Sequence, residues 1–196
     1  AVGAIADDTS GAVRLGGTGA YLVVAAIDDW AEAAALSLEL WFQRDDVEAS
    51  QPILEFTDGE TVGVHVWNHD RGDELYANLI GVESGGHTIA SAEGVVQAET
   101  WHHAVLTYDG TTGRLYLDGA GVGDVAAEAP LRVDGDLHIG HRTAIGEDVE
   151  HFFGGLVDEV AVYDEALDPE TIRAHHAAGV AGVRESPFPL FDWLTP

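Results

Sequence analysis

Hydrophobic and polar residues alternate along most of the chain, in short runs separated by turn residues. In the run from 37 to 44, the apolar side chains of Leu38, Leu40 and Phe42 recur at every second position. A period of two places alternate side chains on opposite faces of a β-strand, so this run predicts a strand with one buried face. Similar runs, bounded by Gly, Asp or Asn, predict strands at 52–56, 61–67, 75–80, 101–108, 114–117, 137–140 and 155–163.

One segment near the C-terminus has the signature of a helix instead. Asp168 is a good N-cap, Pro169 suits the first helical position, and Gly179 can end the helix. We therefore expect a helix over residues 169–178. The alanine-rich run at 31–35 is long enough for one helical turn only. Many short strands without alternating helices predict an all-β, antiparallel sandwich with this single helix.

Length and composition suit one domain of this kind. The 196 residues include 24 glycines and 46% hydrophobic residues, enough for a core and for many turns. The character of the sequence changes near its end, so we expect a domain at 1–183 and an extended tail at 184–196. The tail either folds back over a sheet edge or contacts a neighbouring subunit or domain, through Phe188, Phe191 and Trp193.

The chain is extremely acidic. Eight Arg, no Lys and 35 Asp plus Glu give a net charge of −27. Such a surface repels nucleic acid and anionic membranes, and no apolar run approaches the ~18 residues of a membrane span. Two explanations stay open: an organism that grows in high salt, which screens the repulsion, or a GC-rich genome that favours Arg and Asp codons. The absence of cysteine excludes disulfides but not export.

Two stretches match the motifs of a known family. Residues 153–167 fit the pattern Phe-x-Gly-x-Ile-Asp-Glu-Val-x-Ile-Tyr-x-x-Ala-Leu almost position for position. Residues 101–110 and 115–119 fit Trp-His-His-Val-Ala-x-Thr-Tyr-Asp-Gly and Leu-Tyr-Val-Asp-Gly. Over residues 10 to 180 the chain therefore resembles the concanavalin A-like, laminin-G-like jelly-roll domains of secreted and cell-surface proteins. The resemblance implies a two-sheet antiparallel jelly roll with one short C-terminal helix and an extracellular location.

Asp158 is the acidic residue that most needs an explanation. The period of two places it on the same face as Leu156 and Val160, and a buried carboxylate is costly without a partner. Asp158 either accepts backbone N–H bonds or pairs with an arginine, or it binds a metal. The resemblance favours calcium, because the matching Asp of the family helps to hold a structural Ca²⁺ with carbonyls of an early glycine turn, here Gly16 and Gly17. Where the family has an acid or amide before the turn glycine, this chain has Gly16.

Residues 64–72 are the best candidates for contact with a ligand. An indole face can cover the apolar side of a sugar ring while amide, imidazole and guanidinium groups hydrogen-bond to its hydroxyls. The alternative is a Trp67 that is buried in the sandwich beside a polar hairpin. The expected ligand-binding residues are Trp67, Asn68, His69 and Arg71, with His141 and Arg142 from a later loop.

Signatures of catalysis are missing from the sequence. The ten histidines come without cysteine or an HExxH motif, so they predict no zinc site. Some glucanases share the expected fold and use paired carboxylates, but Glu39 and Glu55 are single strand acids expected on an outer face. No Gly-x-Ser-x-Gly turn presents a nucleophile. We therefore expect no enzymatic activity.

The leading hypothesis is a secreted or surface-displayed recognition module that binds glycans or glycoproteins and carries a structural calcium ion. The alternative is an assembly component of a cell surface, an adhesin or a virion, from a halophile, in which the sandwich serves as a building block. Both hypotheses exclude nucleic acid and membrane insertion.

The salt dependence of stability separates the two explanations of the acidic surface. A halophilic protein should melt at a markedly higher temperature in ~1 M salt than in dilute buffer, because salt screens the repulsion between its carboxylates. Thermal unfolding followed by circular dichroism measures this. Equal melting temperatures in both buffers would contradict the halophile hypothesis.

Overall fold

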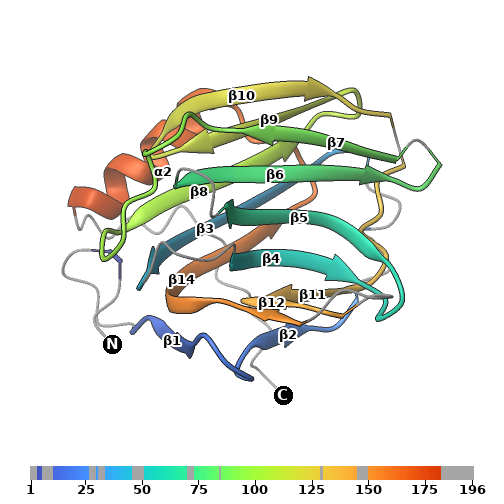
Figure 1. The fold of residues 1–196 in the computed structure, drawn as a ribbon. Coiled ribbons are helices and arrows are strands. Elements are labelled where there is room, and N and C mark those ends of the chain that lie inside the picture. Colours follow the sequence, from blue (N-terminus) through green and yellow to red (C-terminus); the bar gives the residue numbers. More distant parts are fainter. Residues whose placement is uncertain are drawn as a thin grey trace, which may run out of the picture.

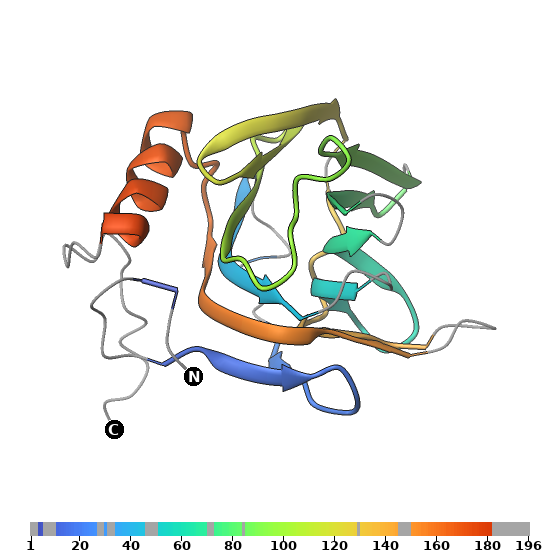
Figure 2. The ribbon, with the colours of Figure 1, turned by 60° about the vertical axis from the view of Figure 1, so that its left-hand side comes forward.

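The protein, seen in a computed structural model, is a two-layer β-sandwich with a C-terminal helix on its outside (Figure 1, Figure 2). The structure describes residues 4–5, 11–26, 30, 34–45, 51–69, 73–83, 85–128, 130–144 and 150–181, with the backbone alone at position 69. The tail at 184–196, with Phe188, Phe191 and Trp193, lies outside the described residues. Among the described residues, no helix is long and apolar enough to cross a membrane.

The first sheet has six strands in the order β1–β14–β3–β8–β9–β10, all paired antiparallel. The helix α2 (Pro169–Ala181) packs on its outer face, as Figure 2 shows. The strand bounds are β1 Val13–Gly16, β3 Leu36–Arg44, β8 His102–Tyr108, β9 Thr112–Leu117, β10 Ala120–Ala126 and β14 Gly154–Tyr163.

The second sheet also has six antiparallel strands, in the order β2–β11–β4–β5–β6–β7, and Figure 1 looks onto its outer face. A small hairpin of β12 (His141–Arg142) and β13 (His151–Phe152) lies against β4. The bounds of the six strands are β2 Leu22–Val24, β4 Gln51–Thr57, β5 Val62–His69, β6 Glu74–Gly81, β7 Gly85–Ala90 and β11 Asp136–Ile139.

The core fills the space between the sheets. Leu38, Leu40 and Phe42, the predicted buried face of β3, are at most 1% exposed, and they pack in one cluster with Phe56 and Val64 of the second sheet. All eight strands predicted from alternation are present, with ends shifted by at most two residues. The predicted all-β sandwich with one C-terminal helix is therefore confirmed.

Two longer strands, β7 and β10, were not predicted because glycines interrupt their alternation. Gly85 and Gly86 open β7, and Gly121 and Gly123 lie in β10. These strands form the same edge of the two sheets and contact each other. A Cβ at Gly123 would lie 2.7 Å from Cγ2 of Ile89, so the glycine allows the two edge strands to approach.

Gly179 has a role other than the predicted one. It lies inside α2, which continues to Ala181, instead of ending the helix. A Cβ at this position would lie 2.4 Å from a ring carbon of Trp41, so the missing side chain lets the helix pack closely on β3. The other end of the helix is as predicted: the Asp168 carboxylate accepts hydrogen bonds from the backbone N–H groups of Glu170 and Thr171.

A buried carboxylate joins the helix to the sheet. Glu39 of β3 is fully buried, and its oxygens lie 2.7 Å from Nε2 of His103 and 3.0 Å from Nδ1 of His175. The Tyr163 hydroxyl donates a third hydrogen bond, of 2.9 Å. Burial alone would raise the pKa of Glu39, but hydrogen bonds and charge from the two histidines outweigh it and lower that pKa to about 2. Glu39 is thus a satisfied structural acid that ties α2 to β3, β8 and β14.

Replacing Glu39 tests this network. Because its folded-state pKa lies below the ordinary value, Glu39 contributes stability above about pH 4.5 that is lost as the pH falls towards about 2. Glu39→Gln should therefore lower the free energy of unfolding at neutral pH by about 2 to 4 kcal/mol. Urea denaturation measures the loss, with Glu93→Gln, an exposed turn position, as the matched control. Equal stability of the two variants would show that the network contributes nothing.

Candidate functional site

A row of polar side chains crosses the outer face of the second sheet. His138, Glu55, His65, Asn78 and Thr88 lie on the adjacent strands β11, β4, β5, β6 and β7, each directly opposite the next. On β11, β4, β5 and β6 both strand neighbours of the row residue are core residues, and on β7 Ile89 is one, so the row points away from the core. Side chains opposite each other on adjacent strands are close enough to act on one ligand.

An aromatic pair lies beside this row, one step further along the strands. Trp67 of β5 is opposite Tyr76 of β6, and their ring centroids are 6.3 Å apart. The His65 ring meets the Tyr76 ring edge-on at 5.8 Å. The face therefore offers flat apolar surface and hydrogen-bonding groups together, which is the composition of ligand pockets in proteins.

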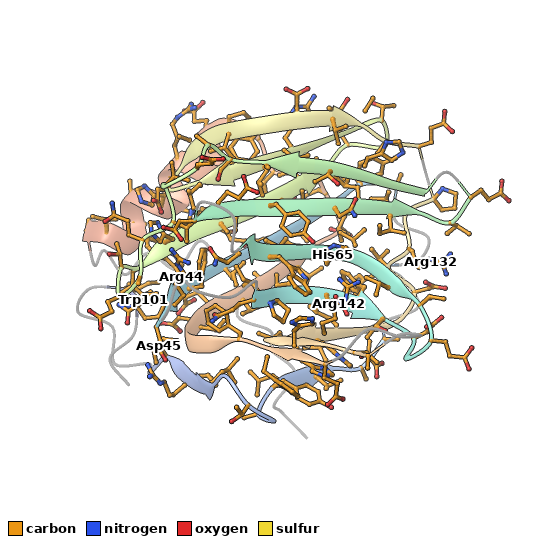
Figure 3. All side chains as sticks on the ribbon, in the orientation of Figure 1. Arg44, Asp45, His65, Trp101, Arg132 and Arg142 are labelled. Carbon is orange, nitrogen blue, oxygen red and sulfur yellow. The ribbon has the colours of Figure 1, made fainter. Side chains whose placement is uncertain are left out.

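The β12–β13 hairpin covers part of this face. The guanidinium carbon of Arg142 lies 5.0 Å from the centroid of the Trp67 ring, in a cation–π contact, and His151 packs against the edge of the same ring. Figure 3 labels Arg142 and His65, which lie near each other over β4 and β5. As a result Trp67 is only 6% exposed, so neither predicted alternative holds fully: the indole lies outside the core but is not an open platform.

Glu55 is the most unusual residue of the face. It is 0% exposed, and Nη1 of Arg142 lies 3.4 Å from its Oε2. Arg142, the Thr143 backbone and the Trp67 indole stabilise the carboxylate partly, yet no described group forms a hydrogen bond of normal geometry with either oxygen. Burial outweighs these partners and raises the pKa of Glu55 to about 7. Unlike Glu39, this acid is buried without being satisfied.

Other polar atoms around Glu55 also lack partners. Among the described residues, no hydrogen bond of normal geometry reaches Nε1 of Trp67, Oγ1 of Thr143 or Nε2 of His141, although all three are buried. The Trp67 indole interacts only weakly with Glu55. Nε2 of His141 lies 3.6 Å from a carboxylate oxygen of Glu150. Buried polar groups in native proteins are almost always paired, so a cluster of unpaired ones points to a bound water or ligand.

A second aromatic cluster extends the face towards its edge. The His141 ring stacks on Tyr21 at 4.1 Å and on Phe152 at 4.9 Å, and its Nδ1 lies 3.0 Å from Nδ1 of His138. Burial lowers the pKa of both histidines. Tyr21 is 40% exposed, so this cluster is accessible from solvent.

The structure brings together some of the predicted ligand residues and separates others. Trp67, His141 and Arg142 meet on the outer face, as described. Asn68 does not join them: it is fully buried and has the inward parity of Val66, so it points between the sheets. The side chain of His69 and all of Arg71 lie outside the described residues.

Four residues of this face were not predicted as ligand contacts. Glu55 was expected on an outer face, which is correct, but not under a covering hairpin. His65 was considered only among the histidines that predict no zinc site, and Tyr76 and Asn78 were not singled out. Their outward parity could be read from the alternation, but only the strand order places them in one row.

Asp158 does not lie on the core face that period two predicted. A β-bulge between Asp158 and Ala161 shifts the parity of β14. Val157 therefore faces the core, whereas Asp158 lies opposite Trp41, on the face of the sheet that α2 covers. Its carboxylate accepts hydrogen bonds from the backbone N–H groups of Ala4, at 2.8 Å, and Glu159, at 3.0 Å. This is the backbone-capping alternative of the two roles considered for Asp158.

The three residues predicted to hold calcium are not brought together. Gly16 pairs with Gly154, four positions before Asp158, a separation of ~13 Å along the strand. The groups that face Asp158 are N–H donors, whereas calcium requires oxygen ligands. Among the described residues, no three His, Asp or Glu side chains converge on a metal position. Asp158, Gly16 and Gly17 therefore do not fit one calcium site, and calcium binding by the chain stays a prediction.

The raised pKa of Glu55 gives a stability test with a definite sign. Folding favours the protonated acid, so its contribution is full below about pH 4.5 and is lost as the pH rises through about 7. Glu55→Gln, a neutral isostere, should raise the free energy of unfolding at about pH 8 by roughly 1 to 3 kcal/mol and change it little near pH 4. Urea denaturation at both pH values measures this, and Glu39→Gln, which should destabilise, is the control. Destabilisation by Glu55→Gln at the higher pH would refute this description of the site.

Comparison with known proteins gives the family. A search of curated proteins by sequence finds no match. Among solved structures, the Ruminococcus gnavus IT-sialidase CBM40 bound to α2,3-sialyllactose is similar, with a TM-score of 0.65 and 15% identity over 84% of this chain and 95% of that one. The heptameric SAP-like pentraxin of Limulus polyphemus has a TM-score of 0.64 and 15% identity, over 87% and 83%.

The binding domain of Botulinum Neurotoxin DC in complex with SialylT has a TM-score of 0.68 and 10% identity, over 89% of this chain and 44% of that one. At such identities these likenesses show the fold alone. The family model Laminin_G_3, described as the concanavalin A-like lectin/glucanases superfamily, matches residues 16–173. Because that match covers most of the chain, the protein belongs to the concanavalin A-like lectin/glucanases superfamily.

Proposed function

We propose that this protein is a non-catalytic glycan-recognition module that binds its ligand on the outer face of the second sheet. The observation that carries the proposal is the cluster of unpaired buried polar atoms beside aromatic rings: both Glu55 oxygens and Nε1 of Trp67, next to Tyr76. Buried polar atoms that no protein group pairs well are available to a water or a ligand, which is a recurrent property of binding sites.

The chemistry of the face matches that of a sugar. A sugar hydroxyl both donates and accepts hydrogen bonds, so it can donate to Glu55 and accept from Trp67 or Arg142 in one contact. The C–H face of a pyranose is apolar and packs on an aromatic ring such as Tyr76, which is partly exposed. Asn78 and Thr88 continue the row with further neutral hydrogen-bonding groups.

The comparisons support this proposal at the level of the fold. Two neighbours carry sialylated ligands in their names, sialyllactose for the carbohydrate-binding module and SialylT for the toxin domain. Recognition without catalysis is supported by the row itself, in which Glu55 is the one carboxyl group, because most glycosidases need two that face each other. An extracellular location and a structural calcium ion are further predictions, and the proposal does not depend on either.

The edge strand β2 favours a second candidate, assembly. Leu22, Val23 and Val24 are 39%, 49% and 38% exposed, although they form the outermost strand of the second sheet. An apolar edge strand with unpaired backbone groups can add to the sheet of a second copy. This observation would suit a building block of a surface or a virion.

A glycan array tests the first candidate directly. The wild-type chain should bind a defined set of glycans in ~1 M salt, and Arg142→Ala and Tyr76→Ala should each weaken the best hit by about tenfold or more, because both line the proposed site. Arg114→Ala, an exposed arginine on the other sheet, is the matched control and should change nothing.

Two results would contradict the proposal. Equal losses for Arg114→Ala and Arg142→Ala would show that binding depends on overall charge and not on this face. A blank array, together with concentration-dependent oligomers in analytical ultracentrifugation, would favour assembly instead.

A further inference from the structure

Arg142 differs from the other arginines whose ion pairs the structure describes. Arg14 and Arg114 lie within 2.7 Å of an aspartate oxygen, and Arg44 lies 3.1 Å from Asp73. Arg142 lies 3.4 Å from Glu55, and within the described part of the chain its guanidinium donates no hydrogen bond of normal geometry. Arg142 is therefore a cation with one weak ion pair, in a chain of net charge −27.

The carboxyl group of Glu55, the partner of Arg142, also compensates the positive charge of Arg142 only weakly. Glu55 is fully buried, so its ionised form is costly, and its pKa is raised to about 7. Near neutral pH a large fraction of Glu55 is therefore protonated, and it then leaves the positive charge of Arg142 uncompensated. A guanidinium binds a carboxylate most strongly through two parallel hydrogen bonds, and the geometry to Glu55 provides neither.

The groups around Arg142 are neutral or can become positive. Burial lowers the pKa of His65 to about 4 and also lowers those of His138 and His141. Tyr76 stays protonated, since burial raises its pKa, and His151 contacts the Trp67 ring at 5.6 Å. Two further acids face the histidines of this cluster: Glu150, which is exposed and lies 3.6 Å from His141, and Asp136, whose charge acts on His138. Among the described residues, Glu55 is thus the one acid that forms an ion pair with Arg142.

Resting on the proposed function, we propose that the ligand is an acidic glycan and that Arg142 binds its carboxylate by exchanging Glu55 for it. The guanidinium pairs with the ligand's carboxylate, the partly exposed Tyr76 packs on its ring, and the neutral histidines contact its hydroxyls. Sialic and uronic acids share this chemistry of a carboxylate on a sugar ring.

The exchange has a pH dependence with a definite sign. A carboxylate ligand is repelled by ionised Glu55, so binding favours the protonated form of Glu55 and takes up a proton. Affinity should therefore rise as the pH falls from about 8 to about 6, a range in which the carboxylate of the sugar itself stays ionised.

Matched sugars test the proposal by isothermal titration calorimetry in about 0.15 M salt. Sialyllactose should bind at least about tenfold more tightly than lactose, or a glucuronic acid disaccharide more tightly than its glucose counterpart. The pair that shows the preference identifies the source of the carboxylate. Arg142→Gln should abolish the preference for the acidic member of the pair, while Arg114→Gln should preserve it.

Glu55→Gln supplies the decisive second variant, since it removes the competing charge without removing a cation. It should increase the affinity for the acidic sugar at about pH 8, and this affinity should then change little between about pH 6 and 8. If Glu55→Gln weakens the binding of the acidic sugar at about pH 8 instead of strengthening it, the exchange is refuted. Equal affinity for both sugars of each pair refutes the acidic preference but leaves a glycan module, whereas no binding of any glycan refutes the proposed function itself.

Discussion

The alternation of inward and outward side chains across β4, β5 and β6 is the constraint on which the rest of the structure depends. Phe56, Val64 and Ala77 are committed to the core, and this fixes the outward direction of their strand neighbours. A slip of one residue between two strands would exchange the core face and the site face. The packing of the core therefore sets the register of the polar row, and the row needs no contacts of its own to be aligned.

Two buried glutamates show how the same burial serves different ends. Glu39 and Glu55 both point outward from a sheet and both are fully covered, one by α2 and the other by the β12–β13 hairpin. Hydrogen bonds from His103, His175 and Tyr163 overcome the cost of burial at Glu39. Glu39 therefore stabilises the packing of the helix on the sheet. At Glu55 the surrounding groups do not overcome the cost of burying the carboxylate. A buried acid of this kind indicates a binding site, whereas a fully paired one such as Glu39 indicates a structural contact.

The fold could be predicted from the sequence because its strongest signals are local. Period-two runs such as Leu38 to Phe42 specify a strand without reference to any other segment, and Asp168 with Pro169 specifies the start of the helix. Where the signal was not local, prediction failed. The bulge after Asp158 reverses the parity of the strand, and the packing of Trp41 on Gly179 depends on a contact far along the chain.

The site was predictable only in part for the same reason. Aromatic and cationic residue types pointed to Trp67 and Arg142, but the covering of Trp67 and the burial of Glu55 arise from a hairpin nearly a hundred residues further along the chain. Strand order is a property of the whole fold, so Tyr76 and Asn78 could not be joined to the row from sequence alone.

The central claim is that a glycan satisfies the unpaired atoms around Glu55, and the indole N–H of Trp67 reports on it directly. In a titration followed by ¹H–¹⁵N NMR, a glycan that binds the wild-type chain should shift the Trp67 indole resonance as a hydrogen bond forms. The Trp41 indole, which also lacks a partner but lies under α2, should stay in place. A saturating glycan that leaves the Trp67 resonance unmoved would contradict the account.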